Sequence, residues 1–203
     1  MNEPHTRQMY LFDADEKELD YRQLEVLSAL SEDAKGTYSF QGLRRKLRFH
    51  QEILSRTLSR LEEQELIERT NDGYRIINPN KGGFRFGYIT KATPIETQAV
   101  TAYLPREVNV SLVLNKLKGR WFREFRWLGY SETQNGLVLS WITDDGHIQI
   151  RANIIKNILT ISAFYESKIE QERAARSTFE LFDFINRSTK QISLPAEPVS
   201  AAA

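Results

Sequence analysis

The sequence predicts an α+β protein with a helical N-terminal domain that ends in a hairpin and a larger domain with an antiparallel sheet and a long C-terminal helix. Three observations support this class. Between residues 20 and 64 apolar side chains recur at helical spacing. Between residues 97 and 165 short runs rich in β-branched and aromatic residues are separated by turn signals. From residue 167 to about 188 the pattern is helical again, and helices grouped on one face of such a sheet are typical of α+β proteins.

Length and composition restrict the class of protein further. The 203 residues are enough for one or two domains, and the net charge of +1 gives no global sign of a polyanionic partner. The chain contains no cysteine, which excludes disulfides and thiolate metal or redox sites. The N-terminus lacks an apolar signal segment, and no apolar stretch approaches the ~20 residues that span a bilayer. We therefore expect a cytoplasmic protein without membrane association.

Composition shifts divide the chain into five parts. Proline and glycine concentrate between the two patterned regions, which is typical of a linker, and the last residues show no pattern that could bury a surface. The predicted parts are an N-terminal extension (1–19), an N-terminal domain (20–78), a linker (79–83), a C-terminal α+β domain (84–190) and a disordered tail (191–203).

The N-terminal domain is predicted to contain three helices followed by a hairpin. Asp20 and Ser39 are suitable N-caps for the first and second helices, whereas His50 is a weaker cap for the third, which runs from about residue 51 to 64. Two short strands follow, at 66–70 and 74–77. The segment that joins them contains Asp72-Gly73, a dipeptide typical of tight hairpin turns.

The stretch from Phe49 to Arg69 resembles the recognition helix and first wing strand of MarR-type and related prokaryotic winged-helix regulators. Members of these families show Ser-Arg, then Leu, then Leu-Glu, and then Gly-Leu-Ile where the chain enters the wing. Here the matching residues are Ser55-Arg56, Leu58, Leu61-Glu62 and Leu66-Ile67. The resemblance covers residues 20–78, less than a third of the chain, and implies a winged helix-turn-helix domain that binds double-stranded DNA and regulates transcription. Glu65 replaces the usual glycine, so we expect a different backbone conformation where the third helix ends.

The third helix has the chemistry of a helix that reads the major groove. When Leu54, Leu58 and Leu61 face the core, the polar residues face outward, namely Gln51, Glu52, Ser55, Arg56, Ser59 and Arg60. Glutamine can pair with adenine and arginine with guanine, while serine can contact phosphates or either base.

Positive charge is concentrated around the second and third helices. Residues 44–60 contain six lysine and arginine residues and a single acid, Glu52. Charge runs on helices are often only solvated surface, but beside a recognition-helix pattern they favour contacts with phosphates. The predicted DNA-binding residues are Arg44, Arg45, Lys46, Arg48, His50, Gln51, Ser55, Arg56, Ser59, Arg60, and the wing-flanking Arg69 and Arg75.

The C-terminal domain is predicted to dimerise, and it could also hold a small-molecule effector. Predicted strands lie at 84–90, 97–104, 120–130, 137–143, 147–152 and 158–165, and predicted helices at 107–118 and 167–188. The last helix has more apolar surface than one packed face needs, through Ile169, Phe179, Leu181, Phe182, Phe184 and Ile185. We interpret this surface as core plus a homodimer contact, since two-fold dimers match palindromic operators.

The predicted strand at 120–130 combines aromatic and basic residues. We expect Trp121, Phe125 and Trp127 to share a buried face, with Arg120 and Arg126 opposite and Arg123 on the aromatic face. The alternative is that these residues stack on single-stranded nucleic acid.

Signs of catalysis are missing from the sequence. The histidines at 5, 50 and 147 have no metal-ligand spacing, and no phosphate-binding glycine loop or nucleophile motif is present. We therefore expect no enzyme activity, no cofactor and no metal. Two alternatives to a sequence-specific regulator stay open: a winged-helix protein-interaction module of the transcription or replication machinery, and a single-stranded nucleic-acid binder that uses residues 120–130.

Overall fold

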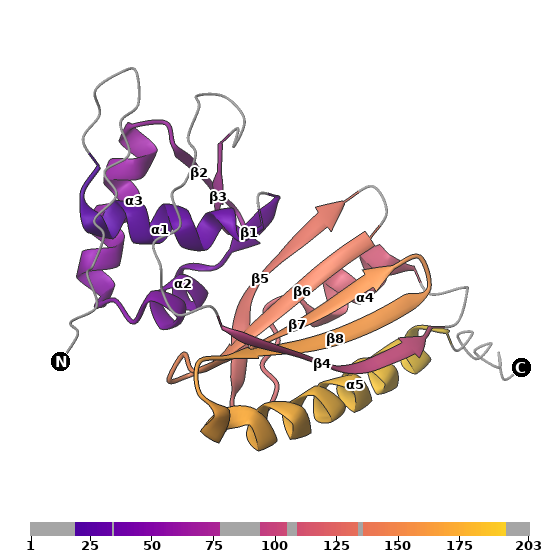
Figure 1. Cartoon of the computed structure of the whole chain (residues 1–203). Helices are drawn as coiled ribbons and strands as arrows, with labels where there is room; N and C mark the ends of the chain where they lie inside the picture. Colours follow the sequence, from indigo (N-terminus) through magenta and orange to yellow (C-terminus); the bar gives the residue numbers. More distant parts are fainter. Residues whose placement is uncertain (1–18, 34, 78–93, 105–108, 134–135, 194–203) are drawn as a thin grey trace, which may run out of the picture. The chain divides into compact units, whose positions relative to one another are not determined.

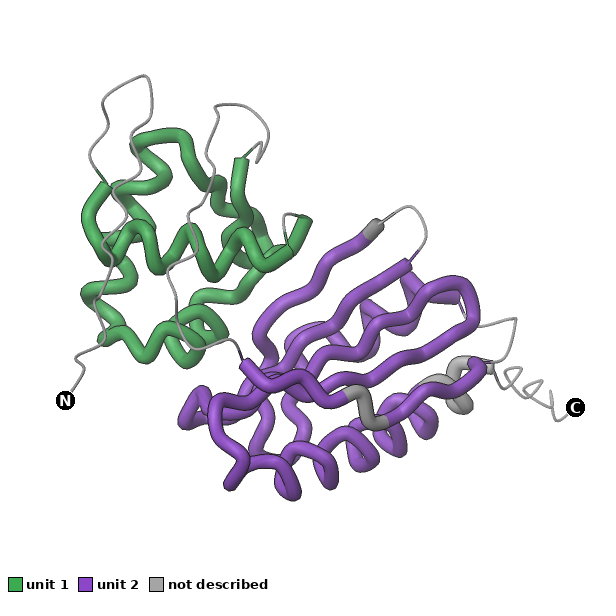
Figure 2. Tube along the Cα trace, in the orientation of Figure 1, with its two compact units in different colours: residues 1–93 green, residues 94–203 purple. Residues whose placement is uncertain are grey.

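The computed structural model describes residues 19–33, 35–77, 94–104, 109–133 and 136–193, in two compact units formed by residues 1–93 and 94–203 (Figure 2). Both units combine helices with antiparallel strands, which confirms the predicted α+β class. Most of the predicted extension and tail, the predicted linker and the predicted strand at 84–90 lie outside the described residues.

The described residues of unit 1 form three helices and a three-stranded antiparallel sheet (Figure 1). In chain order its elements are α1 (Tyr21–Ser31), β1 (Gly36–Tyr38), α2 (Phe40–Leu47), α3 (Gln51–Glu63), β2 (Ile67–Thr70) and β3 (Gly73–Ile76). Strand β3 lies in the middle and pairs with β2 and β1. The sequence did not predict β1, whose three residues are too few to show an alternating pattern.

Side-chain hydrogen bonds cap the N-termini of α1 and α2, as predicted. The carboxylate of Asp20 accepts a hydrogen bond from the backbone N–H of Gln23 at 2.8 Å, and the Gln23 side chain accepts one from the backbone N–H of Asp20 at 2.9 Å. The Ser39 hydroxyl accepts from the backbone N–H of Gly42 at 3.0 Å. His50 precedes α3 but makes no side-chain cap bond, in agreement with its weak capping tendency.

The helices bury one face each, and together with the sheet these faces form the core of unit 1. Its fully or almost fully buried side chains are Val26, Leu27, Leu30, Tyr38, Leu43, Leu47, Leu54, Leu58, Leu61, Ile67, Tyr74 and Ile76. Because α3 supplies three of these leucines, its opposite face is fixed toward solvent.

The end of α3 has the backbone conformation that glycine usually adopts there, although the residue is Glu65. Its φ is +59°, its N–H donates to the Glu62 carbonyl at 2.9 Å, and the Leu66 N–H donates to the Leu61 carbonyl at 3.0 Å. This pair of bonds is the Schellman pattern. The expectation of a different conformation was therefore wrong, because the two bonds and the following strand impose the left-handed turn on a residue that disfavours it.

Replacing Glu65 with glycine should raise the free energy of unfolding by about 0.5–1 kcal/mol, because glycine adopts a positive φ without the Cβ penalty but loses more entropy on folding. Urea titration followed by circular dichroism measures the effect. Glu63→Gly, two residues earlier at the last residue of α3, is the matched control and should lower stability by up to about 1 kcal/mol. Equal losses in both variants would contradict this account of Glu65.

In the described residues, unit 2 is a five-stranded antiparallel sheet with two α-helices and one short 3-10 helix (Figure 1). Its elements are β4 (Ile95–Tyr103), α4 (Val110–Leu117), β5 (Phe125–Thr133), β6 (Gly136–Thr143), β7 (Ile148–Ile155), β8 (Ile158–Tyr165), the short 3-10 helix η1 (Lys168–Glu170) and α5 (Gln171–Ser193). The strand order is β5-β6-β7-β8-β4, so the earliest strand lies at the edge beside the last. Alternate residues of the strands pack with α4 and α5 in one core, which includes Val113, Leu117, Leu139, Trp141, Ile150, Ile161, Leu181 and Ile185.

The predicted strand at 120–130 begins later than expected, at Phe125. Backbone bonds in both directions between Phe122 and Phe125, at 2.9 and 2.7 Å, close a tight turn in which Arg123 has a φ of +49°. Trp121 is therefore not in the core. It is 66% exposed, and the Arg126 guanidinium lies 4.5 Å from the centre of its ring.

The rest of this segment follows the predicted alternation in part. Phe125 and Trp127 are buried in the core as predicted, and Arg126 faces the other way. The expected place of Arg123 was wrong, because the turn directs its guanidinium to Glu180 of α5, at 3.2 Å. A bulge between Trp127 and Gly129 also shifts the register with β6.

Candidate nucleic-acid interface

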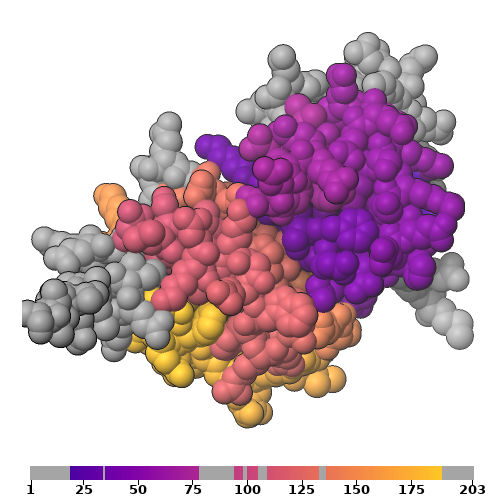
Figure 3. Space-filling view, turned by 180° about the vertical axis from the view of Figure 1, so that it is seen from behind, coloured from indigo at the N-terminus to yellow at the C-terminus, as the bar shows by residue number. Residues whose placement is uncertain are grey.

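The outward face of α3 carries the residues that the sequence pattern placed there. Leu54, Leu58 and Leu61 are buried, whereas the six polar residues Gln51, Glu52, Ser55, Arg56, Ser59 and Arg60 are all exposed. In the space-filling view, α3 and the β2–β3 hairpin contribute purple and magenta atoms to one continuous area of the surface (Figure 3). The helix thus presents amide, hydroxyl and guanidinium groups on a rigid backbone.

Several of the predicted cations are already paired with carboxylates. Arg56 contacts Glu52 at 2.5 Å, and Arg60 contacts Asp20 at 3.3 Å. Lys46 lies 2.9 Å from Glu32, and only 13% of its side chain is exposed. These carboxylates reduce the positive potential that the count of basic residues suggested.

The hairpin shows the same pairing. Arg75 on β3 contacts Glu68 at 2.5 Å, and the two residues are direct cross-strand partners in the hairpin. Arg69 on β2 is exposed. Exposed ion pairs contribute only about 0–1 kcal/mol each, so the cations of this surface could exchange a carboxylate for a phosphate at small cost.

The remaining predicted residues lie on α2 and in the turn that follows it. Arg44 and Arg45 are half-buried on α2, and the Arg45 guanidinium donates to the Gln41 carbonyl at 3.2 Å. Arg48 ends α2 with a φ of +56° and is exposed, as is His50. These side chains precede the N-terminus of α3, the end of a helix that carries partial positive charge.

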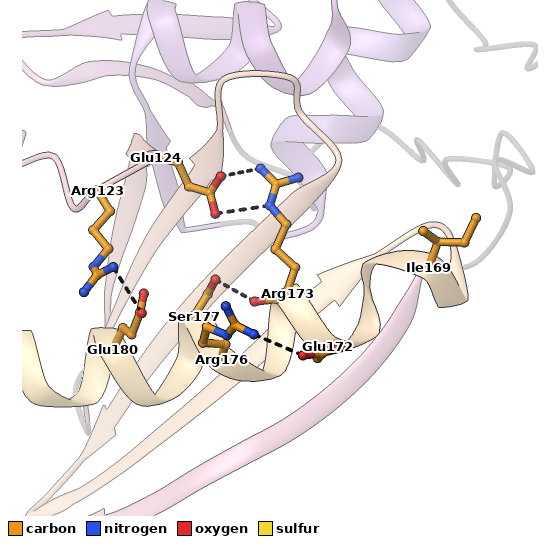
Figure 4. A pocket seen from close by; sticks show the side chains of 8 residues that line it. All are labelled: Arg123, Glu124, Ile169, Glu172, Arg173, Arg176, Ser177 and Glu180. Atoms are coloured by element: carbon orange, nitrogen blue, oxygen red, sulfur yellow. Dashed lines mark hydrogen bonds and ion pairs between the residues drawn. The ribbon is translucent and has the colours of Figure 1, made fainter.

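A second candidate site is a groove on unit 2, between α5 and the turn before β5 (Figure 4). Its volume is about 510 Å³, and it is lined by Arg123, Glu124, Ile169, Glu172, Arg173, Arg176, Ser177 and Glu180. Each arginine has a carboxylate partner within the groove: Glu180, Glu124 and Glu172 pair with Arg123, Arg173 and Arg176, respectively (Figure 4). Small-molecule sites are mostly apolar with few polar groups, so this lining does not favour an effector site.

Arg173 connects three parts of unit 2. Its guanidinium donates to Glu124 of the turn before β5, to Asp145 of the β6–β7 turn at 3.4 Å and to Glu170 of η1 at 3.3 Å. The hydrogen bond to Glu124 is the main reason that the pKa of Arg173 is raised. The arginine therefore stays charged and ties the start of α5 to two loops.

Asp145 has a lowered pKa for a combination of reasons. Burial raises the pKa, but hydrogen bonds from the Thr143 hydroxyl and the His147 N–H, together with the charge of Arg173, lower it by more. A carboxyl whose folded pKa lies below its unfolded value stabilises the fold above the unfolded pKa. That contribution is lost as the pH falls through the folded pKa.

Replacing Asp145 with asparagine should therefore destabilise the protein at neutral pH but less so in acid. We expect a loss of at most about 1 kcal/mol at pH 7, because the pair with Arg173 is partly exposed. The difference from the wild type should shrink below about pH 4, where the unfolded carboxyl becomes protonated. Urea midpoints between pH 7 and pH 2.5 test this, and a difference that does not change with pH would contradict it.

Comparisons with known protein families, with curated proteins and with solved structures found no match to this chain. Within the described residues, no helix is long and apolar enough to cross a membrane. The same part of the chain contains no group of three or more histidine, aspartate or glutamate side chains that could hold a metal ion.

Proposed function

We propose that unit 1 is a winged helix-turn-helix domain and that the protein is a sequence-specific, double-stranded DNA-binding regulator of transcription. The observation that carries the proposal is the exposed face of α3, where amide, hydroxyl and guanidinium groups lie opposite three buried leucines. Strand β1 supports it, because its pairing with β3 attaches the hairpin to the helical part of the unit. The β2–β3 hairpin would be the wing.

In this proposal α3 enters the major groove and separate groups supply specificity and affinity. Gln51 and Arg56 have the geometry to pair with adenine and guanine edges, and Ser55 and Ser59 can contact bases or phosphates. The cations of α2 and its turn, Arg44, Arg45, Lys46 and Arg48, would contact phosphates, as would the exposed imidazole of His50. Arg69 and Arg75 would contact the backbone beside the wing.

Titration of duplex DNA at several salt concentrations tests the proposal. If four or five cations meet phosphates, the logarithm of the binding constant should fall with the logarithm of the salt concentration with a slope of roughly −4 per monomer. Genomic duplex fragments should differ in affinity. Equal and weak binding to all fragments would contradict sequence-specific regulation and favour a winged-helix module that binds a protein of the transcription or replication machinery.

The structure argues against the alternative in which residues 120–130 bind single-stranded nucleic acid. Stacking on single-stranded nucleic acid needs several accessible rings. Phe122, Phe125 and Trp127 are buried and Tyr130 is partly buried, so of the aromatic residues between 120 and 130 only Trp121 is exposed. The proposed role is binding without catalysis.

We further propose that the protein is a homodimer that uses α5, as operators with two-fold symmetry require. Leu181 and Ile185 on this helix are buried, but Phe179 is 57% exposed and lies among charged residues that could pair across a two-fold axis. Binding of a small-molecule effector by unit 2 stays a prediction from the sequence.

Phe179→Asp should convert the dimer to a monomer, because it replaces the exposed aromatic side chain of the proposed contact with a charge that would be buried there. Light scattering coupled to size-exclusion chromatography gives the mass directly. Tyr103→Asp is the matched control: it replaces an aromatic side chain on β4 that is 80% exposed, and it should leave the mass unchanged. A monomeric wild type, or a Phe179→Asp variant that is still a dimer, would contradict the role of α5.

A further inference from the structure

Glu52 is an unexpected residue on the face of α3. It is the one acid between residues 44 and 60, and it lies in the first turn of the helix with 65% of its side chain exposed. If this face meets DNA, a carboxylate here is repelled by the phosphates and lowers the affinity for every sequence. The first turn of a recognition helix is also where side chains reach the base edges.

The carboxylate of Glu52 is held against the guanidinium of Arg56, one helical turn later. The Arg56 Nη2 donates to the Glu52 Oε1 at 2.5 Å, and 74% of the Arg56 side chain is exposed. The bond uses one oxygen of the carboxylate and one nitrogen of the guanidinium. The paired heads therefore still offer an acceptor and several donors side by side.

That arrangement is complementary to one base pair in the major groove. A C·G pair presents the cytosine N4 amino group as donor, next to the guanine O6 and N7 acceptors. A carboxylate beside a guanidinium presents one acceptor next to donors, in the matching order. An A·T pair instead places the adenine amino donor between two acceptors, adenine N7 and thymine O4. With the carboxylate on that amino group, the guanidinium can reach only one of the two acceptors, so one hydrogen bond is lost relative to the C·G pair.

We propose that Glu52 and Arg56 act as a unit that reads a single C·G base pair, with Glu52 accepting from cytosine N4 and Arg56 donating to guanine O6 and N7. This inference rests on the proposed binding of duplex DNA. The plainer role of Glu52 is local, since an acid in the first turn and an i,i+4 ion pair each stabilise a helix by a few tenths of a kcal/mol. The two roles differ in one respect: a local role does not affect which base is preferred.

Selection from a random duplex pool with the full-length protein, followed by titration of the selected duplex and its single-base-pair variants, separates these roles. For the wild type we expect one C·G position that is preferred over the other base pairs by roughly 5- to 150-fold. Glu52→Ala should lose most of that preference and bind unrelated duplexes a few-fold more tightly, because the repulsion is removed. Glu52→Gln should shift the preference toward A·T, since glutamine pairs with adenine.

Glu63→Ala is the matched control, because it removes an exposed carboxylate from the other end of α3. It should keep the wild-type preference, and thermal unfolding followed by circular dichroism verifies that all variants are folded. A Glu52→Ala variant that selects the same C·G position with the same ratio would overturn this inference and leave the DNA-binding proposal intact. A wild type that enriches no duplex would overturn both.

Discussion

Replacing Gly73 with alanine should lower the free energy of unfolding of the protein by roughly 3–5 kcal/mol, the sum of a backbone strain and a steric clash. Gly73 starts β3 with a φ of +143°, which L-residues rarely adopt. A Cβ at this position would lie 2.1 Å from the Tyr38 carbonyl oxygen and 3.0 Å from the Ser39 nitrogen. Both atoms belong to the backbone around the end of β1, so neither can move away without separating β1 from β3.

Gly119→Ala is the control that measures the backbone strain of a positive φ without a steric clash. Gly119 has a φ of +71°, but no atom lies within 4 Å of the place where its Cβ would be. This variant should lose only about 1–2 kcal/mol. Urea unfolding of both variants measures the difference, and similar losses would show that the close approach of β1 and β3 contributes nothing.

This glycine shows what the sequence could and could not predict about unit 1. Asp72-Gly73 correctly indicated a hairpin, because turn chemistry is local. The reason for the glycine is not local. Neither Asn71 nor Asp72 has a positive φ, and Gly73 is instead required by the approach of Tyr38, 35 positions earlier, on a strand that the sequence pattern did not reveal.

In the segment at 120–130 the sequence pattern predicted too long a strand, whereas it missed β1 altogether. Its aromatic residues continued an alternating pattern, and the pattern alone extended the strand back to residue 120. A tight turn without glycine, with Arg123 in the left-handed region, ends the alternation before Phe125. Periodicity could not reveal this turn, because arginine gives no turn signal.

The candidate nucleic-acid interface could also be predicted from the sequence only in part. Helical spacing was enough to predict which residues of α3 are exposed, and the i,i+4 spacing of Glu52 and Arg56 already implied a pair. The Arg75–Glu68 pair follows from the register of a two-residue hairpin loop. The Arg60–Asp20 pair joins residues 40 positions apart, so the fold had to be known before the partners of the cations could be counted.

Replacing Arg56 with alanine should weaken binding to the preferred duplex by about 1–3 kcal/mol, or roughly 5- to 150-fold, if the guanidinium pairs with a guanine edge. Arg56 is well placed for this role, since its side chain is 74% exposed on α3 and its present partner, Glu52, is also exposed. Arg56→Lys keeps the charge but loses the planar fork, so it should keep most of the binding to unrelated duplexes and lose the preference for the selected one.

Arg22→Ala is the control for charge alone, because it removes an exposed arginine on α1 of the same unit. Titrations of the selected duplex and of an unrelated duplex, at one salt concentration, compare the three variants with the wild type. If Arg56 contacts only a phosphate, Arg56→Ala should weaken binding to both duplexes by the same factor and Arg56→Lys should bind both like the wild type. If Arg56 contacts a base edge, both Arg56 variants should bind the selected duplex more weakly and the unrelated duplex unchanged, and Arg22→Ala should show no such difference. Only a base contact depends on both the DNA sequence and the shape of the cation.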